Sequence, residues 1–189
     1  MYQLYVDLRT SYNKSQGQIP GRYGMNATDW RALVEYREGH LYWLVRPSRG
    51  RVKPGDRAGC QGMRKGYWVI THRGRRYGYH RVIWAVCNGD IPEGSYIDHI
   101  DRDPTNNRIE NLRLATPAQN GFNRLKGLAS KSSTFKGVCR ANLHGRLFWK
   151  ASIKAKGKVY HLGFFDHEEE AAGAYAEAAL ALHGEFAAF

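Results

Sequence analysis

The stretch "YIDHIDRDPTNNRIENLRLATPAQN", residues 96–120, is dense in asparagine and acidic side chains and carries few bulky apolar ones. Asparagine is unfavourable inside helices and strands, so this density first suggests turns. The pattern nevertheless predicts a strand that ends near His99, a tight loop from Asp101, and a second, kinked strand. Thr116 followed by Pro117 marks a helix start, because threonine caps helices and proline suits the first helical position. We therefore predict strand, loop, strand and helix, in this order.

Asp98 and His99 stand side by side at the end of the first predicted strand. Hydrolysis of a phosphodiester requires a metal ion that offsets charge on the phosphate and a base that takes a proton from water. Asp98 offers a hard oxygen ligand, and His99 belongs to the residue type that titrates near neutral pH. Neighbours on a flat strand point to opposite faces, so both could reach one phosphate only where the strand ends or twists. The loop at Asp101 provides such an end.

Two asparagines could complete this group. Asn111, on the far side of the loop, could return a hydrogen bond to His99 and leave one ring nitrogen free as a base. Asn120, on the predicted helix, offers a neutral carbonyl oxygen as a second metal ligand. A calcium-binding loop over the same segment is the alternative, but its sixth position is Asn106 rather than glycine and its twelfth is Leu112 rather than glutamate. We therefore do not expect a calcium loop.

The segment "DHIDRDPTNNRIENLRLATPAQN" closely resembles the ββα-metal motif of HNH endonucleases, especially the phage and intron-homing type in which asparagine replaces the last histidine. The preceding "YHRVIWAVCNGDIPEGSYI" resembles the usual lead-in of that family, and the resemblance covers residues 39–124. It implies His99 as the general base and Asp98 and Asn120 as ligands of a single divalent ion such as Mg or Mn. It also implies Asn111 as the residue that orients His99.

The charge of the chain is high and unevenly placed. Its 189 residues carry a formal net charge of +12, which indicates a polyanionic partner, with nucleic acid as the leading candidate. Residues 39–89 hold eleven Lys or Arg and one acid, and residues 126–165 hold nine and no acid. Residues 166–189 hold six acids and no Lys or Arg. Such separate blocks favour a binding surface over a uniformly solvated basic surface.

Other features of the composition exclude several classes of protein. No run of eighteen apolar residues suggests a membrane span, and the first residues lack the pattern of a secretory signal, so we expect an intracellular protein, in the cytoplasm of a bacterial host if phage-encoded. The three cysteines stand far apart without a C-x-x-C pair. This spacing predicts neither a disulfide framework nor a structural zinc site. The oligomeric state is open, with a monomer favoured.

Two strand-like runs, "GYWVITHRG" and "RRYGYHR", precede the motif. The Arg/Gly-rich tip between them suits a hairpin lying over a phosphate backbone. Arg73, Arg75, Arg76 and Arg81 are candidate phosphate contacts, with simple surface exposure as the alternative. His80 could touch the phosphate or hydrogen-bond within the core, and we favour the core.

Two helices are predicted around these strands. "MNATDWRALVEYREG" predicts a helix with Thr28 or Asp29 as N-cap and Gly39 as its stop. "HRVIWAVCNGD" has apolar residues at helical spacing and an Asn-Gly stop, although its β-branched residues leave a strand open. We favour a short helix for this second segment.

The C-terminal segment predicts three successive strands, "FKGVCRANL", "LFWKASIKA" and "KVYHLGFF", followed by one helix. Asp166 is the predicted N-cap of that helix, and Ala172, Tyr175, Ala179 and Leu182 form its predicted apolar stripe. A helix on one face leaves the other face of the sheet free for the phosphates of DNA. Residues that could contact DNA from this sheet are Arg140, Arg146, Trp149, Lys150, Lys154 and Lys158, with the strand register not fixed by the sequence.

The same segment resembles the plant ethylene-response-factor (Apetala-type) DNA-binding domain, most strongly in "LGFFDHEEEAAGAYAEAA". The resemblance covers nearly all of residues 133–189 and implies that a three-stranded sheet lies in the major groove. His161 stands where that family commonly has tryptophan, so the DNA sequence that the family reads does not transfer to this chain.

These inferences predict an α+β protein in which a ββα-metal nuclease domain precedes a small three-stranded antiparallel sheet packed on one helix. The predicted parts are an N-terminal extension with one helix (1–38), the nuclease domain (39–125), a linker (126–134) and the DNA-binding domain (135–189). The predicted function is metal-dependent hydrolysis of double-stranded DNA, by nicking or double-strand cutting. A DNA-binding regulator with an inactive nuclease unit is the alternative, and an RNA-directed nuclease is a third possibility.

Overall fold

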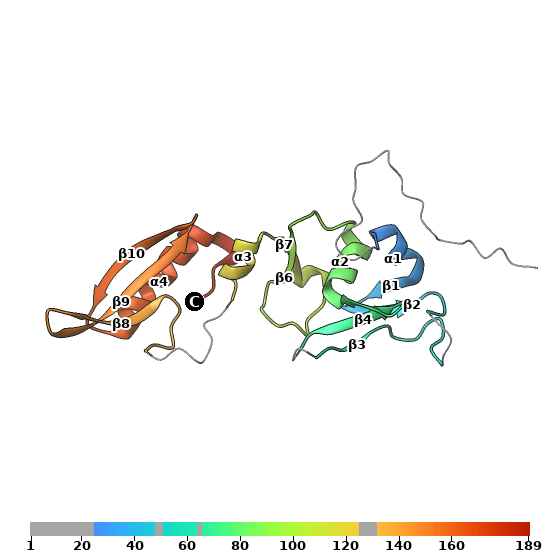
Figure 1. Ribbon diagram of the computed structural model, residues 1–189, viewed down its shortest axis with the longest axis horizontal. Coiled ribbons are helices and arrows are strands. Elements are labelled where there is room, and N and C mark those ends of the chain that lie inside the picture. Colours follow the sequence, from blue (N-terminus) through green and yellow to red (C-terminus); the bar gives the residue numbers. More distant parts are fainter. Residues whose placement is uncertain (1–24, 48–50, 64–65, 125–131) are drawn as a thin grey trace, which may run out of the picture.

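A computed structural model describes residues 25–47, 51–63, 66–124 and 132–189, and these form two units (Figure 1). The first unit contains α1 (Ala27–Leu33), β1 (Val34–Arg37), β2 (His40–Trp43), β3 (Cys60–Gln61), β4 (Trp68–His72), β5 (Arg75–Gly78), α2 (Tyr79–Asn88), β6 (Tyr96–His99), the 3-10 turn η1 (Ile109–Asn111), β7 (Leu112–Ala115) and α3 (Pro117–Phe122). The second contains β8 (Val138–Leu143), β9 (Arg146–Ala155), β10 (Lys158–Phe165), α4 (Glu168–His183) and the 3-10 turn η2 (Gly184–Phe186).

Helix α1 is shorter than predicted. Its N-cap is Asn26 rather than Thr28 or Asp29, and the Asn26 and Asp29 side chains each accept a hydrogen bond from the other's backbone N–H, which forms a capping box. From Val34 the chain continues as strand β1, which pairs with β2 across a turn that ends at Gly39. The prediction of a helix up to Gly39 was therefore wrong, because the β-branched Val34 begins a hairpin instead.

Helix α2 lies at the centre of the first unit, where the predicted short helix forms. The Tyr79 hydroxyl accepts a hydrogen bond of 2.7 Å from the backbone N–H of Leu41, so α2 is tied to β2 in the core. Trp30 and Val34 belong to the same cluster of buried residues as Ile83. The described part of the predicted N-terminal extension thus packs within the first unit, while residues 1–24 lie outside the described residues.

Strands β6 and β7 and helix α3 form the predicted strand, loop, strand and helix. The two strands are antiparallel, with Asp98 opposite Arg113 in the register. The predicted kink in the second strand corresponds to η1, which precedes β7. Thr116 caps α3 with a capping box and Pro117 occupies its first turn, as the sequence predicts. This arrangement places the ends of β6 and α3 beside each other.

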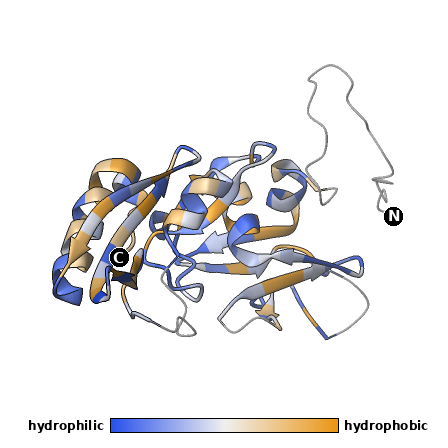
Figure 2. Ribbon diagram, turned by 60° about the vertical axis from the view of Figure 1, so that its left-hand side comes forward, coloured by the Kyte–Doolittle hydropathy of each residue, from blue (hydrophilic) through white to orange (hydrophobic). Residues whose placement is uncertain are grey.

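In the second unit the three strands pair antiparallel in the order β10-β9-β8, and α4 packs on one face (Figure 1). Orange and blue alternate along these strands in Figure 2, as expected for a sheet that is covered on one face only. Val138, Ala151 and Ala171 form the buried contact between sheet and helix. The predicted α+β fold, with a three-stranded antiparallel sheet on one helix, is confirmed.

Helix α4 differs from its prediction at both ends. Its N-cap is His167 rather than Asp166. Tyr175 is buried as predicted, but Leu182 is exposed and His183 is buried in its place, because His183 packs against the first unit.

No helix in the described part of the chain is long and apolar enough to cross a membrane.

The register of the second sheet decides which predicted DNA-contacting residues share a face. Residues directly opposite in an antiparallel pair point to the same side, and Ala151 and Ile153 bury the α4 side of β9. The free face carries three of the predicted residues: Arg146, Lys150 and Lys154. The helix side carries the other three: Arg140, Trp149 and Lys158. The six predicted residues therefore do not form one surface.

Candidate active site

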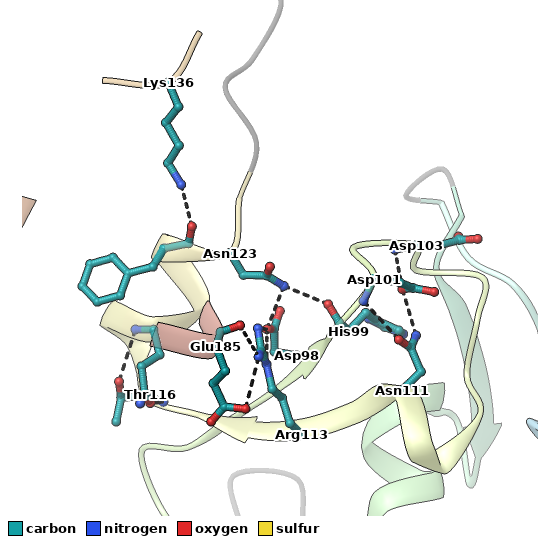
Figure 3. Close-up of polar contacts among 12 residues, drawn as sticks. Asp98, His99, Asp101, Asp103, Asn111, Arg113, Thr116, Asn123, Lys136 and Glu185 are labelled. Carbon is teal, nitrogen blue, oxygen red and sulfur yellow. Dashed lines mark hydrogen bonds and ion pairs between the residues drawn. The ribbon is translucent and has the colours of Figure 1, made fainter. Parts of the chain in front are cut away.

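Asp98 lies near the end of β6 with its side chain only 9% exposed. Its Oδ2 atom accepts three hydrogen bonds, from Arg113 Nε at 3.1 Å, from Arg113 Nη2 at 3.0 Å and from Asn123 Nδ2 at 2.9 Å (Figure 3). Among the described residues, none donates a hydrogen bond to Oδ1. A carboxylate has lone pairs on both oxygens. One oxygen is thus held by the protein, and the other can serve as a ligand.

His99 follows Asp98 on β6 and is only 5% exposed. Its Nε2 atom lies 3.3 Å from Asn107 Oδ1. The Asn107 amide donates through Nδ2 to the carbonyl oxygens of Thr105 and Pro104, so its own oxygen faces His99 as an acceptor. Nε2 is therefore the ring nitrogen that carries the hydrogen, and Nδ1 is the one that can take a proton. Asn107, which belongs to the predicted tight loop, contacts the His99 ring.

Asn111 does not hold His99 in the way that the sequence predicts. Its Nδ2 donates to Asp101 Oδ1 at 2.9 Å and to the Asn106 carbonyl at 2.8 Å, and its Oδ1 accepts from Asp101 N (Figure 3). Within the described chain it makes no hydrogen bond to His99. Because Asn111 sits in η1, across the loop from β6, its side chain reaches the loop rather than the ring. Asn111 therefore contacts the loop that carries Asn107, and its role in orienting His99 stays a prediction.

The Asp101 carboxylate organises this loop. It accepts hydrogen bonds from the backbone of Asp103 and from the side chains of Asn106 and Asn111. Burial acts to raise the pKa of Asp101, but these donors and the nearby His99 hold its pKa below the ordinary value. The loop therefore keeps a charged, hydrogen-bonded centre at neutral pH.

Asn123, rather than Asn120, is the helix residue that reaches Asp98. It is the C-cap of α3 and is buried, and its Nδ2 donates to Asp98 Oδ2 and to the His99 carbonyl at 2.8 Å (Figure 3). Asn120 is half-buried and makes no hydrogen bond to Asp98 in the described chain. Residues three apart on a helix are neighbours, so Asn120 lies one turn from Asn123 and stays a prediction as a ligand. The two asparagines look alike in sequence, and only their contacts distinguish them.

The donors at this site fit a hard divalent cation. Asp98 Oδ1 is a carboxylate oxygen, and Asn123 Oδ1 is an amide oxygen. Neither accepts a hydrogen bond from the described residues. No group of three or more His, Cys, Asp or Glu side chains in the described residues could hold a metal. Mg²⁺ is commonly held by one or two carboxylates, with water and substrate phosphates as further ligands. One carboxylate with neighbouring amides matches that mode.

His80 is half-buried beside His99, with the two ring centroids 5.1 Å apart. Burial, together with the charges of His99 and Arg81, lowers the pKa of His80 to about 3. His80 is therefore neutral at physiological pH. It supplies an uncharged wall to the His99 pocket.

The four predicted phosphate-binding arginines lie on the β4–β5 hairpin and on α2. Arg73, Arg75 and Arg76 are exposed on the β4–β5 hairpin, and Arg73 has a positive φ of 49° in its turn. Arg81 is half-buried on α2, with a hydrogen bond of 3.4 Å from its Nη1 to the Ser95 carbonyl. Arg113, which the sequence did not suggest, is the arginine that contacts Asp98.

Comparisons with known proteins place these residues among relatives. A model of the HNH endonuclease family matches residues 77–122. Protein 3.8 of Escherichia phage T7 is 39% identical over 127 residues, which cover 67% of this chain and 99% of that protein. An uncharacterised HNH endonuclease of Acanthamoeba polyphaga mimivirus is 40% identical over 126 residues, 66% of this chain and 63% of its own. A Bacillus subtilis SPbeta prophage protein named as an HNH homing endonuclease is 37% identical over 57 residues, 30% of this chain and 33% of its own. No solved structure matches significantly.

Proposed function

Because the chain belongs to the HNH endonuclease family, we propose that it is a metal-dependent DNA endonuclease with His99 as its general base. The observation that supports this most is the pairing of Asp98, whose Oδ1 has no partner among the described residues, with the adjacent His99, whose Nε2 is held by Asn107. The first supplies a cation ligand and the second a base within one strand end.

In this proposal each side chain has a separate task. His99 Nδ1 takes a proton from the attacking water, while Asn107 keeps the hydrogen on Nε2. Asp98 and Asn123, with Asn120 as a further candidate, would hold one divalent ion, Mg or Mn. When bound, such an ion offsets charge on the scissile phosphate. Asn111 keeps the loop in place through Asp101.

Access to His99 requires a small opening. The Tyr67 ring lies edge-on to His99 at 6.2 Å between centroids, and Tyr67 is 38% exposed. Rotation of this partly exposed side chain would admit water or a phosphate to His99. The low exposure of His99 is also the observation that favours the second candidate, a DNA-binding regulator with an inactive nuclease unit.

DNA docking on the free face of the second sheet is part of the proposal. Arg146, Lys150 and Lys154 lie there with Phe148 and Phe164, whose rings are 6.4 Å apart. Arg146 also pairs with Asp166 at 2.7 Å in an exposed ion pair, which contributes little stability and can exchange for a phosphate. The acidic first turn of α4 lies with the helix on the covered face. The exposed arginines of the β4–β5 hairpin are candidate phosphate contacts of the first unit.

The decisive test is cleavage of supercoiled plasmid DNA with Mg or Mn by the His99→Ala variant. We expect cleavage to fall by about 10²–10⁴-fold, the usual effect of removing a general base, while DNA binding persists. His167→Ala, at an exposed histidine, is the matched control and should cut normally. Normal cutting by His99→Ala would contradict the role of His99. A wild-type protein that leaves the plasmid supercoiled with either metal would favour the regulator.

A further inference from the structure

Arg113 joins the candidate metal ligand to the second unit. Its Nε and Nη2 donate to Asp98 Oδ2, and its Nη1 donates to the backbone carbonyl of Glu185 at 2.8 Å. The Phe186 ring lies against the guanidinium, with Cζ 3.7 Å from the ring centroid. The Glu185 carboxylate adds an ion pair at 3.6 Å. One buried side chain thus contacts both the catalytic strand and turn η2 (Figure 3).

The second unit also holds helix α3, which leads into Asn123. Phe122, the last residue of α3, stacks on His183 with centroids 3.7 Å apart and planes 5° from parallel. Lys136 Nζ donates to the carbonyl oxygens of Phe122 and Arg124, which caps the end of this helix. Both elements that flank Asp98, β7 and α3, are therefore in contact with residues that follow the predicted linker (126–134).

The positive charge of Arg113 does not explain why this residue lies beside a candidate metal ligand. A guanidinium beside Asp98 offsets the negative charge that would attract a cation, so its electrostatic effect opposes metal binding. Its geometry has the opposite effect, because both N–H groups are directed to Oδ2 and leave Oδ1 free. The other side of the Arg113 guanidinium contacts Glu185 and Phe186, which limits its freedom to turn away from Oδ2.

We propose that the Glu185–Phe186 turn is part of the cleavage site. The turn holds the Arg113 guanidinium in place, and Arg113 in turn orients Asp98 for the metal ion. The second unit then has a role that is separate from DNA docking: it completes the metal site. Arg113 and Phe186 are positioning residues, since they act through Asp98. This inference rests on the proposed function, in which Asp98 holds a divalent ion.

The test is Phe186→Ala in the full chain, with Phe189→Ala as the matched control. Phe186 is 5% exposed, whereas Phe189, three residues further on, is 55% exposed. Titration calorimetry with Mn²⁺ in the absence of DNA measures metal affinity directly. We expect Phe186→Ala to weaken it by about 10-fold or more, the usual effect of removing a group that orients a metal ligand. The Mn²⁺ concentration for half-maximal cleavage should rise by the same factor, and DNA binding without metal should not change.

A second variant keeps the inference testable if Phe186→Ala does not fold. Arg113→Lys keeps the positive charge but removes the fork that holds Asp98 Oδ2, so it should show the same drop in Mn²⁺ affinity while circular dichroism shows a folded chain. Mn²⁺ affinity in a folded variant within twofold of Phe189→Ala would overturn the inference. If the wild-type chain neither binds Mn²⁺ nor cuts DNA, the proposed function itself fails, which is a different outcome.

Discussion

At the scale of single residues, the site depends on polar side chains that hold one another in fixed orientations. Asp98 has one oxygen occupied and one without a protein partner in the described chain, and His99 is held at one nitrogen. Buried polar groups tolerate few arrangements, because breaking a hydrogen bond leaves an unsatisfied partner in the protein interior. The neutral His80 beside His99 belongs to the same packed group.

His80 should make the stability of the protein depend on pH. Burial depresses the pKa of His80 to about 3, whereas an unfolded histidine titrates near pH 6.5. The unfolded state therefore binds more protons between these values, so stability is complete above about pH 6.5 and falls as the pH drops towards about 3. His80→Gln should reduce the fall in unfolding free energy between pH 6.5 and pH 5 by about 2 kcal/mol. Urea titrations at both pH values measure this.

The exposed His167→Gln variant controls for removing one histidine. If the stability of His80→Gln falls as much as that of the wild type over this pH interval, His80 is not the group that titrates.

At the scale of elements, close packing fixes individual backbone positions. Gly137, just before β8, has a φ of +72°, and a Cβ there would lie 2.1 Å from Cδ2 of Tyr175 on α4. The Tyr175 ring thus lies directly on the backbone where β8 begins, and this contact sets how closely the helix approaches the sheet. Gly145, in the β8–β9 turn, also has a positive φ, of +85°, but open space around it.

These two glycines separate backbone strain from packing. Gly145→Ala should cost only the strain of a positive φ. Gly137→Ala meets the same strain and in addition the Tyr175 ring, so it should destabilise the chain by about 1–3 kcal/mol more, the usual cost of overpacking. Unfolding midpoints in urea give the difference. Equal midpoints for the two variants would mean that Tyr175 moves aside without cost.

At the scale of the whole molecule, the two units are in contact, and we propose that they share functions rather than act separately. The first carries the candidate catalytic residues, and the second presents basic residues on its free face while η2 and His183 contact β7 and α3. The net charge of +12 provides long-range attraction to DNA. Specific phosphate contacts should come from the side of the sheet that α4 leaves open.

The salt dependence of DNA binding tests this face. Replacing Lys150 and Lys154 together with glutamine should lower the slope of log K against log salt by roughly 0.9 for each phosphate that the variant no longer neutralises. Lys158→Gln, on the helix side of the sheet, is the control and should leave the slope unchanged. An unchanged slope in the double variant would contradict DNA docking on this face.

The sequence by itself predicted local structure well at several elements. Thr116 and Pro117 mark the start of α3, and the three strand runs predicted in the C-terminal segment correspond to β8, β9 and β10. These features depend on neighbours in the chain, through capping and turn preferences. The adjacency of Asp98 and His99 was likewise visible, because both stand at one strand end. The HNH family was recognisable from the same residues.

Only the tertiary structure decided which partners these residues meet. It brought Asn123 rather than Asn120 to Asp98, placed Asn107 rather than Asn111 at His99, and joined Arg113 to Phe186 across the two units. It also divided the basic residues of the second sheet between two faces. Strand register and contacts between distant segments set these choices, and neither follows from local preference, because a shift of one residue reverses the face of every side chain.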